Sequence, residues 1–240
     1  KIDEVIALSR VAAELGGIST SHLREEGLGL IDGVAEAITI GREAKIPVIL
    51  THHKAVGKFM WGRSAQTLAM VDSARREGID VMVDVYPYTA TSTSLSVLIP
   101  TWAFDGGDSA FRRRVREPAT RDSIRKDIIR LINTDRGGGD ISRVQFSRVS
   151  WHPELAGKNL PDWARQRGLE PTPEHGADLV LEGQLKGGAS MIYHVLDEQD
   201  VQRIMKHPQA FIGSDGRLTR LNDGSSPHPR ALGTFPRVLG

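Results

Sequence analysis

The order of apolar and polar positions along the chain predicts helices that alternate with short strands. Apolar residues recur at helical spacing in some segments, whereas short apolar runs bounded by polar residues are typical of buried strands. The predicted helices cover residues 2–15, 30–44, 64–76, 160–167, 177–185 and 198–206, and the predicted strands cover 18–21, 46–51, 79–85, 144–149, 190–195 and 210–213. This alternation favours a parallel sheet, because parallel strands need crossover helices.

Residues 104–140 interrupt the alternation. They contain Gly106-Gly107, a basic stretch at 112–116 and a triple glycine at 137–139. We expect an insertion with one or two helices and a mobile loop. The basic stretch is short, and a solvated helix face explains it better than a binding site for an anionic polymer.

Polar side chains follow four of the predicted strands, at or just after the point where each strand ends. They are His22, His52, Tyr86 and Asp215. A doubly wound sheet and a closed barrel both fit the alternation, but side chains at strand ends converge in a barrel. No Gly-x-Gly-x-x-Gly follows any predicted strand, which weakens a nucleotide-binding interpretation.

Two histidines at neighbouring strand ends suggest a metal site. Neutral imidazoles that aim at one point suit zinc, which takes nitrogen, sulfur and oxygen ligands. From spacing alone, hydrogen-bonded caps of the strand ends are the simpler explanation of His22 and His52. His53 points the opposite way in a strand and is the weaker candidate. Asp215 alone reads as a turn residue before Gly216, but beside two histidines it reads as a metal ligand or general base.

Four further residues are candidate substrate contacts. Lys54 and Arg230 would hold a carboxylate, Tyr86 would donate to a developing oxyanion, and Ser92 would supply a hydroxyl. Taken singly, each has an ordinary structural explanation. The other histidines lack a clear strand-end position and are interpreted as structural or exposed: His152, His175, His194, His207 and His228.

Composition narrows the function classes. The 240 residues carry 31 Lys and Arg against 30 Asp and Glu, so a net charge of +1 predicts neither nucleic acid nor an anionic membrane as partner. No cysteine is present, which excludes disulfides and Cys-ligated metals within the chain. No apolar run of about 18 residues and no signal peptide is visible, so we expect a cytoplasmic protein. Both ends look like cuts from a longer chain.

Nearly the whole chain resembles the N-acyl-D-amino-acid deacylases, or D-aminoacylases, of the amidohydrolase superfamily. The likeness rests on motif order and context. The most specific motifs are the tyrosine segment and the ending. The motifs are Ser19-Thr20-Ser21-His22-Leu23-Arg24-Glu25-Glu26-Gly27, Thr51-His52-His53-Lys54, Asp84-Val85-Tyr86-Pro87-Tyr88-Thr89-Ala90, Gly213-Ser214-Asp215-Gly216, and residues 227–240.

The resemblance implies a (β/α)8 barrel of amidohydrolase type, of which roughly the last five strands are present. Residues 1–240 would form the C-terminal part of this barrel, with the 104–140 insertion. His22 and His52 resemble the histidines that hold a tightly bound zinc. The resemblance leaves the number of metals undecided between this one site and a second, weaker site. The family's upstream cysteine and His-x-His pair are absent here, which agrees with truncation. Arg217 stands where the family often has an apolar residue.

The resemblance further implies zinc-dependent hydrolysis of N-acyl-D-amino acids, which are small molecules. Asp215 matches the catalytic aspartate, and Lys54, Tyr86, Ser92 and Arg230 match residues that grip the substrate. The alternatives are a D-aminoacyl dipeptidase, a cyclic-amide hydrolase of the dihydroorotase or hydantoinase kind, and a non-catalytic fragment or pseudo-enzyme. Cyclic-amide hydrolases usually bridge two metals with a modified lysine, and Lys54 lies two residues past a predicted ligand, which counts against them.

Overall fold

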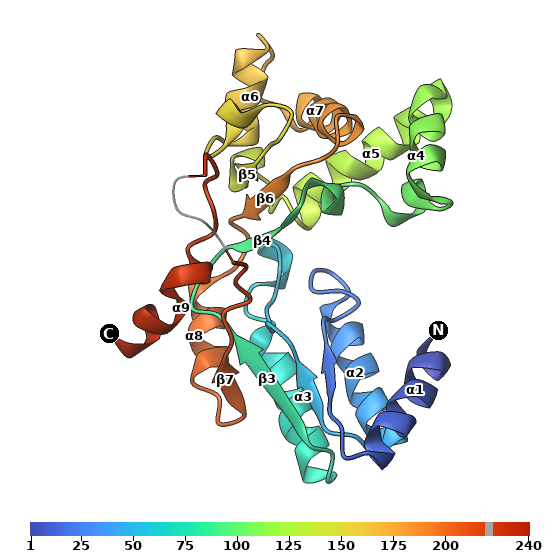
Figure 1. The fold of residues 1–240 in the computed structure, drawn as a ribbon, viewed down its shortest axis with the longest axis vertical. Coiled ribbons are helices and arrows are strands. Elements are labelled where there is room, and N and C mark those ends of the chain that lie inside the picture. Colours follow the sequence, from blue (N-terminus) through green and yellow to red (C-terminus); the bar gives the residue numbers. More distant parts are fainter. Residues whose placement is uncertain (219–222) are drawn as a thin grey trace.

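The fold divides into two lobes, each with its own sheet and its own buried apolar cluster. A computed structural model describes residues 1–218 and 223–240. One lobe holds a parallel sheet with helices packed on it, and the other holds a small antiparallel sheet surrounded by helices (Figure 1). Within the described ranges, no helix is long and apolar enough to cross a membrane.

The parallel sheet has the strand order β1-β2-β3-β7 among the described residues. Its strands are short and apolar at their buried positions, as parallel strands covered by helices require. They are β1 (Ser19–Ser21), β2 (Val48–Leu50), β3 (Val81–Val85) and β7 (Ala210–Ile212), and the helices of this lobe are α1 (Ile2–Glu14), α2 (Leu30–Ala44), α3 (Ser64–Arg76) and α8 (Glu198–Met205).

The second sheet has the order β4-β6-β5 and is antiparallel throughout. It is formed by β4 (Thr91–Ser94), β5 (Val144–Arg148) and β6 (Ser190–Tyr193), with α4 (Gly107–Arg116), α5 (Pro118–Thr134), α6 (Leu160–Gln166) and α7 (Pro173–Leu185) around it. The last helix, α9 (Arg230–Leu239), lies near the junction of the two lobes (Figure 1). Short 3-10 segments occupy Lys58–Met60, Leu95–Leu98, Thr101–Phe104, Ile141–Arg143 and Pro153–Leu155.

The predicted helices and strands all exist, with boundaries that shift by a few residues. The prediction of a single parallel sheet is wrong for two of them, because β5 and β6 pair with β4 in the antiparallel sheet. The parallel sheet therefore holds four of the described strands, not roughly five. The apolar runs at 144–149 and 190–195 gave no hint of this, since a fully buried antiparallel strand carries the same pattern as a parallel one.

Residues 104–140 contain the two helices α4 and α5, which pack on each other. The apolar side of α5 is buried in the second lobe through Ile124, Ile128 and Ile132. After α5 the chain turns through Asp135, and its glycines lie close to that helix: a Cβ on Gly137 would meet the carbonyl oxygen of Ile132 at 2.3 Å. This turn brings the end of the segment to the carboxyl ends of the parallel strands.

Candidate active site

The carboxyl ends of the four parallel strands adjoin, and the predicted site residues follow them. Register places Ser21 beside Leu50, Leu50 beside Val83, and Val85 beside Ile212. His22 comes one residue after β1, His52 two after β2, Tyr86 one after β3 and Asp215 three after β7. The common direction of the strands therefore gathers side chains that are nearly 200 residues apart at one edge of the sheet.

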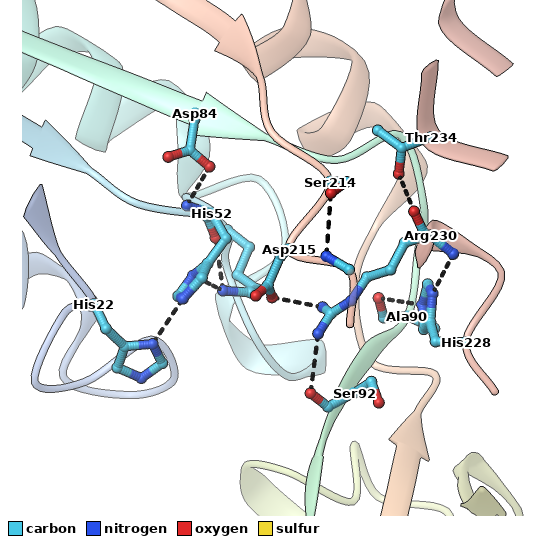
Figure 2. A network of polar contacts seen from close by, with 12 residues as sticks. His22, His52, Asp84, Ala90, Ser92, Ser214, Asp215, His228, Arg230 and Thr234 are labelled. Atoms are coloured by element: carbon cyan, nitrogen blue, oxygen red, sulfur yellow. Dashed lines mark hydrogen bonds and ion pairs between the residues drawn. The ribbon is translucent and has the colours of Figure 1, made fainter. Parts of the chain in front are cut away.

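The two predicted metal-binding histidines face each other. His22 Nδ1 lies 2.8 Å from His52 Nε2, and the rings meet edge to face with centroids 4.6 Å apart (Figure 2). The two side chains differ in burial, because the His52 side chain is 10% exposed and that of His22 is 65% exposed. Two ring nitrogens that point at the same small space are the arrangement the metal interpretation requires.

His52 is held in a conformation that residues with a side chain rarely adopt. Its φ is 41°, and Asp215 has a φ of 47°; with Lys45 they are the non-glycine residues of positive φ in the described ranges. Asp84 stabilises the first of these turns, because its Oδ1 accepts a 2.7 Å hydrogen bond from the His52 backbone N–H. Burial raises the pKa of Asp84, and that hydrogen bond opposes the shift. Left-handed backbone at two predicted site residues is typical of functional positions.

Lys54 contacts Glu26, for which the sequence predicted no role, and His52. Its ammonium lies 2.5 Å from Glu26 Oε1, and 2.6 Å from both the carbonyl oxygen and the Nδ1 of His52. Glu26 is 3% exposed. Burial would raise the pKa of Glu26, but Lys54 and His52 outweigh it and lower that pKa below its ordinary value. Burial lowers the pKa of Lys54, against the effect of Glu26.

The Tyr86 ring lies near both of the predicted carboxylate-binding cations. The Lys54 ammonium is 5.9 Å from the centre of its ring, and the Arg230 guanidinium is 4.8 Å from it. The ring is 2% exposed, and its hydroxyl makes no hydrogen bond with any described residue. Burial raises the pKa of Tyr86. The tyrosine hydroxyl is therefore buried beside Arg230, and no described acceptor takes its hydrogen.

Arg230 joins Asp215 to β4. Its Nη1 is 2.8 Å from Asp215 Oδ2, and its Nη2 donates to the backbone carbonyl of Ser92 at 3.2 Å (Figure 2). The Arg230 side chain is 8% exposed and that of Asp215 is 37% exposed. His228 anchors the turn before α9: its Nδ1 accepts from the Arg230 N–H at 3.0 Å, while its Nε2 lies 3.0 Å from the Ala90 carbonyl.

A cavity of about 320 Å³ opens beside this group, lined by Ser92, Asp215, His228, Arg230 and other mostly polar residues. Its wall includes several serine and threonine hydroxyls from β4, β5 and β6. Two larger hollows, of about 500 and 590 Å³, lie among α4, α5 and α7 and contain none of the predicted site residues. The smaller cavity thus adjoins Ser92, Asp215 and Arg230 of the predicted site residues, whereas His22, His52, Lys54 and Tyr86 do not line it.

Asp215 stands apart from the histidine cluster. The described residues that could share one metal ion are His22, Glu26 and His52, whose possible ligand atoms lie within 4.8 Å of one another. Asp215 is not among them and pairs with Arg230. The structure thus brings together one group around the histidines and another around Asp215 (Figure 2). The Tyr86 ring lies within reach of both, 5.9 Å from the Lys54 ammonium and 4.8 Å from the Arg230 guanidinium.

The remaining histidines have structural or surface contacts. His53 is buried against Thr67, with 2.7 Å between Nε2 and Oγ1, so it points away from His22 as expected. The others each have a protein partner: His152 with Glu154, His175 with Glu170, His194 with Gln145 and His207 with Asp72.

Glu26, Asp84 and Arg136 are the site residues that sequence reasoning missed. Glu26 lies in a charged run, Arg24-Glu25-Glu26, which is typical of an exposed loop. Arg136 follows α5 in the supposed insertion, and its Nη1 is 3.6 Å from Glu26 Oε2. Asp84 is the first residue of the tyrosine motif at 84–90, but the sequence predicted no role for it. Only the position of Asp84 inside an apolar strand could have singled it out.

The residues present fit a zinc ion by their chemistry. Two imidazole nitrogens converge, one histidine is buried, and the Glu26 carboxylate lies 3.1 Å from the other nitrogen of that histidine. The lysine in the cluster does not fit a metal bridge, because its amine is engaged with Glu26 in a buried ion pair. A modified, metal-bridging lysine of the cyclic-amide hydrolase kind would need that nitrogen.

Known proteins with similar sequences are deacylases of N-acyl-D-amino acids. The chain is 33% identical over 240 residues to an N-acyl-D-glutamate deacylase, and 34% identical over 238 residues to a D-aminoacylase, both from Alcaligenes xylosoxydans xylosoxydans. Each alignment covers 99% of this chain, but only 38% and 39% of the relatives. No family model matches the chain.

Solved structures similar to this chain are of the same kinds of enzyme. The N-acyl-D-glutamate deacylase from Bordetella bronchiseptica, complexed with zinc and a phosphonate inhibitor that mimics the tetrahedral intermediate, matches with a TM-score of 0.71 and 31% identity. A D-aminoacylase studied for its binuclear metal centre matches with a TM-score of 0.70 and 33% identity. Both alignments cover 100% of this chain and 40% of the solved one. The chain thus spans well under half the length of the proteins it matches.

Proposed function

Because the chain belongs to the D-aminoacylase family, we propose that it carries part of the active site of a zinc-dependent amidohydrolase that cleaves N-acyl-D-amino acids. The products are a carboxylate and a free D-amino acid. The observation that carries the proposal is the convergence of His22 and His52, 2.8 Å apart, at the same sheet edge as Asp215. The rest of the site, including a further metal ligand, would come from chain outside these 240 residues.

The four parallel strands belong, in this proposal, to a (β/α)8 barrel. β1 and β7 are the outer strands of the sheet among the described residues, so each offers an edge for further strands. Ile18 beside β1 and Phe211 in β7 are 56% and 38% exposed, as expected of apolar residues that further chain would cover. The segment 104–140 is an insertion on this barrel, together with the small antiparallel sheet.

His22 and His52 would hold the tightly bound zinc, and Asp215, which pairs with Arg230 outside the histidine cluster, would act on the water beside it. A bound zinc supplies a Lewis acid that polarises the acyl carbonyl and acidifies water. A second, weaker metal is in keeping with the binuclear centre of the D-aminoacylase studied for it. The pairing of Lys54 with Glu26 argues against a lysine bridge between two metals.

Asp215 acts as general base and then as general acid. It takes a proton from the attacking water, whose oxygen bonds to the acyl carbon. The carbon–nitrogen bond then breaks, and Asp215 returns the proton to the leaving amine, so atoms and charge balance. Arg230 holds Asp215 in place at 2.8 Å while the proton is transferred. The Tyr86 hydroxyl, free of other partners, donates to the oxygen that gains negative charge.

Lys54 and Arg230 bind the substrate α-carboxylate from two sides of the Tyr86 ring. The two cations hold the carboxylate and the rest of the site holds the acyl carbonyl. The stereocentre between them is thereby oriented, and this orientation selects the D-form. Ser92 lines the cavity beside Arg230 and contributes its hydroxyl to the same end of the substrate. The substrate is a small molecule, and neither nucleic acid nor membrane enters the proposal.

Removal and restoration of zinc tests the proposal. The longest reading frame that contains this chain should release free amine from N-acetyl-D-amino acids when loaded with zinc. Activity should disappear after dialysis against a chelator and return with added zinc. Hydrolysis of D-aminoacyl dipeptides or of cyclic amides, without hydrolysis of N-acyl-D-amino acids, would favour a relative with another amide substrate. Absence of both hydrolysis and zinc would favour a non-catalytic chain.

A further inference from the structure

Glu26 is the only carboxylate among the described residues that contacts both a predicted zinc ligand and a predicted substrate cation. Its Oε1 lies 3.1 Å from His52 Nδ1 and 2.5 Å from Lys54 Nζ. Its Oε2 faces Arg136, with 3.6 Å between the charged atoms. Glu26 is 3% exposed. Burial of an unpaired charge is costly, and the three positively charged or polar groups around the carboxylate offset that cost.

The backbone around Glu26 is fixed from two sides. Its carbonyl accepts a 2.8 Å hydrogen bond from the Val56 N–H, which ties it to the segment after Lys54. The next residue is Gly27, where a Cβ would meet Asp135 Oδ1 at 2.0 Å. The turn after α5 and the turn after β1 therefore approach each other closely at Gly27, beside the carboxylate.

The contacts of His52 determine which ring nitrogen can bind a metal. A neutral imidazole carries one N–H, so a nitrogen that binds metal requires the hydrogen on the other one. His22 faces Nε2 of His52, whereas Glu26 faces Nδ1. Glu26 Oε1 can accept the Nδ1 hydrogen, and this leaves Nε2 free for a metal. Carboxylates beyond the ligands commonly orient a ligating histidine in this way.

Lys54 competes for the same nitrogen. As an ammonium it has three hydrogens, and three acceptors surround it: Glu26 Oε1, the His52 carbonyl and His52 Nδ1. When His52 Nδ1 carries its own hydrogen, Lys54 loses one acceptor and has one hydrogen to offer elsewhere. The Tyr86 ring, 5.9 Å away, marks the side on which the substrate carboxylate would lie.

We propose that Glu26 is a positioning residue that orients His52 toward the metal and holds the Lys54 ammonium for the substrate carboxylate. This inference rests on the proposed function. Glu26 belongs to the group that could share one metal ion, with Oε1 3.9 Å from His22 Nδ1, but that oxygen lies nearer to His52 Nδ1, at 3.1 Å, and we assign it to this nitrogen. The end of α5 takes part through Arg136, which holds the second oxygen of Glu26.

The test compares Glu26→Gln with Glu25→Gln in the longest reading frame that contains this chain. Glu25 is the exposed neighbour in the same charged run and serves as the matched control. Zinc affinity is measured by competition with a chromophoric chelator, and affinity for a D-amino acid product is measured on the zinc-loaded protein. In Glu26→Gln we expect zinc affinity to fall by about 10- to 100-fold and product affinity to fall as well, whereas Glu25→Gln leaves both unchanged.

Two further variants separate the roles and guard against misfolding. Lys54→Met should keep the zinc affinity and lose only the product affinity. Glu26→Gln combined with Lys54→Met removes both charges of the buried pair, so it should fold even where the single variant is unstable. The double variant should still bind zinc weakly. Unchanged zinc affinity in it would overturn the effect of Glu26 on His52.

The cobalt-substituted protein distinguishes a positioning role from direct ligation. We expect Glu26→Gln to bind cobalt more weakly but with the absorption spectrum of the unsubstituted protein. A changed spectrum would show that Glu26 is itself a ligand and would overturn the positioning role. Zinc binding that depends on Glu26, without hydrolysis of any N-acyl-D-amino acid, would leave this inference standing and overturn the proposed reaction. An unsubstituted protein that binds no zinc would overturn both.

Discussion

Arg230 Nη1 lies 2.8 Å from Asp215 Oδ2, so the residue proposed to bind the substrate also holds the proposed general base. The guanidinium has a second anchor in the Ser92 carbonyl, which Nη2 reaches at 3.2 Å. A planar fork that serves two acceptors differs from a point charge, and lysine cannot reproduce it. The pair links the last parallel strand of the sheet to β4 of the second lobe.

We therefore predict that Arg230→Lys lowers kcat/KM for an N-acyl-D-amino acid by roughly 100-fold, with a fall in kcat as well as a rise in KM. The charge remains, but the second hydrogen bond and the fixed direction are lost. Steady-state kinetics on the zinc-loaded protein measures both parameters. Arg237→Met, which removes an exposed arginine from the same helix, is the control and should leave both unchanged. A change in KM alone would mean that Arg230 does not act on Asp215.

The Asp200 carboxylate should be structural. It accepts hydrogen bonds from the Gly62 N–H at 2.7 Å, from Ser64 and from Arg203, and it is 2% exposed. This network joins the start of α3 to α8. Ser64 is the first residue of α3, and its hydroxyl bonds to Asp200, while the N-cap position is Arg63.

We predict that Asp200→Ala lowers the free energy of unfolding by about 3 kcal/mol, because buried donors lose their acceptor. Urea unfolding measures the change. The exposed pair Asp122–Lys126 supplies the control, since Asp122→Ala should leave the stability as it is. Specific activity per folded molecule should not change, and its loss in Asp200→Ala would place this network in the active site.

His228 should make stability depend on pH. Burial and the neighbouring Arg230 lower the pKa of His228 to about 4. Its Nδ1 accepts from the Arg230 N–H, so the folded state requires the neutral ring. Between pH 6.5 and 4 the unfolded chain binds a proton there and the folded one does not, so stability is full above pH 6.5 and declines as the pH falls.

We predict a loss of about 3 kcal/mol between pH 7 and pH 4 from this residue alone. His228→Gln keeps a donor and an acceptor but does not titrate, so its stability should decline less over the same range. Urea unfolding at a series of pH values gives both curves. Parallel curves for the two proteins would mean that His228 is not held neutral in the folded state.

The sequence was sufficient to predict most helices and strands, because the spacing of apolar residues shows directly which positions are buried. Helices 30–44 and 64–76 have the predicted bounds. The errors lie where burial does not reveal the pairing partner. Residues 144–149 and 190–195 have the composition of buried strands, but their partner is β4, whose sequence Thr-Ser-Thr-Ser has no apolar pattern at all. α9 was also missed, since Pro236 within it argues against a helix.

The site shows the same limit. His22 and His52 were identified as site residues by their positions at the ends of strands. Neighbouring parallel strands run in the same direction, and this is enough to bring the two side chains together. The contacts of Glu26 and Arg136 depend on how two turns pack, and no local pattern encodes that. Glu26 is 3% exposed, and the next residue, Gly27, lies against Asp135, an approach that belongs to the folded chain and not to the charged run in which Glu26 lies.

The central claim is a zinc-dependent, D-selective amide hydrolysis that uses His52 and Asp215. Its most direct test is free-amine release from N-acetyl-D- and N-acetyl-L-amino acids by the zinc-loaded, longest reading frame that contains this chain. We predict release from the D-substrates alone, abolished in His52→Ala and in Asp215→Ala. Full activity in Asp215→Ala, or equal release from the L-substrates, would contradict the account.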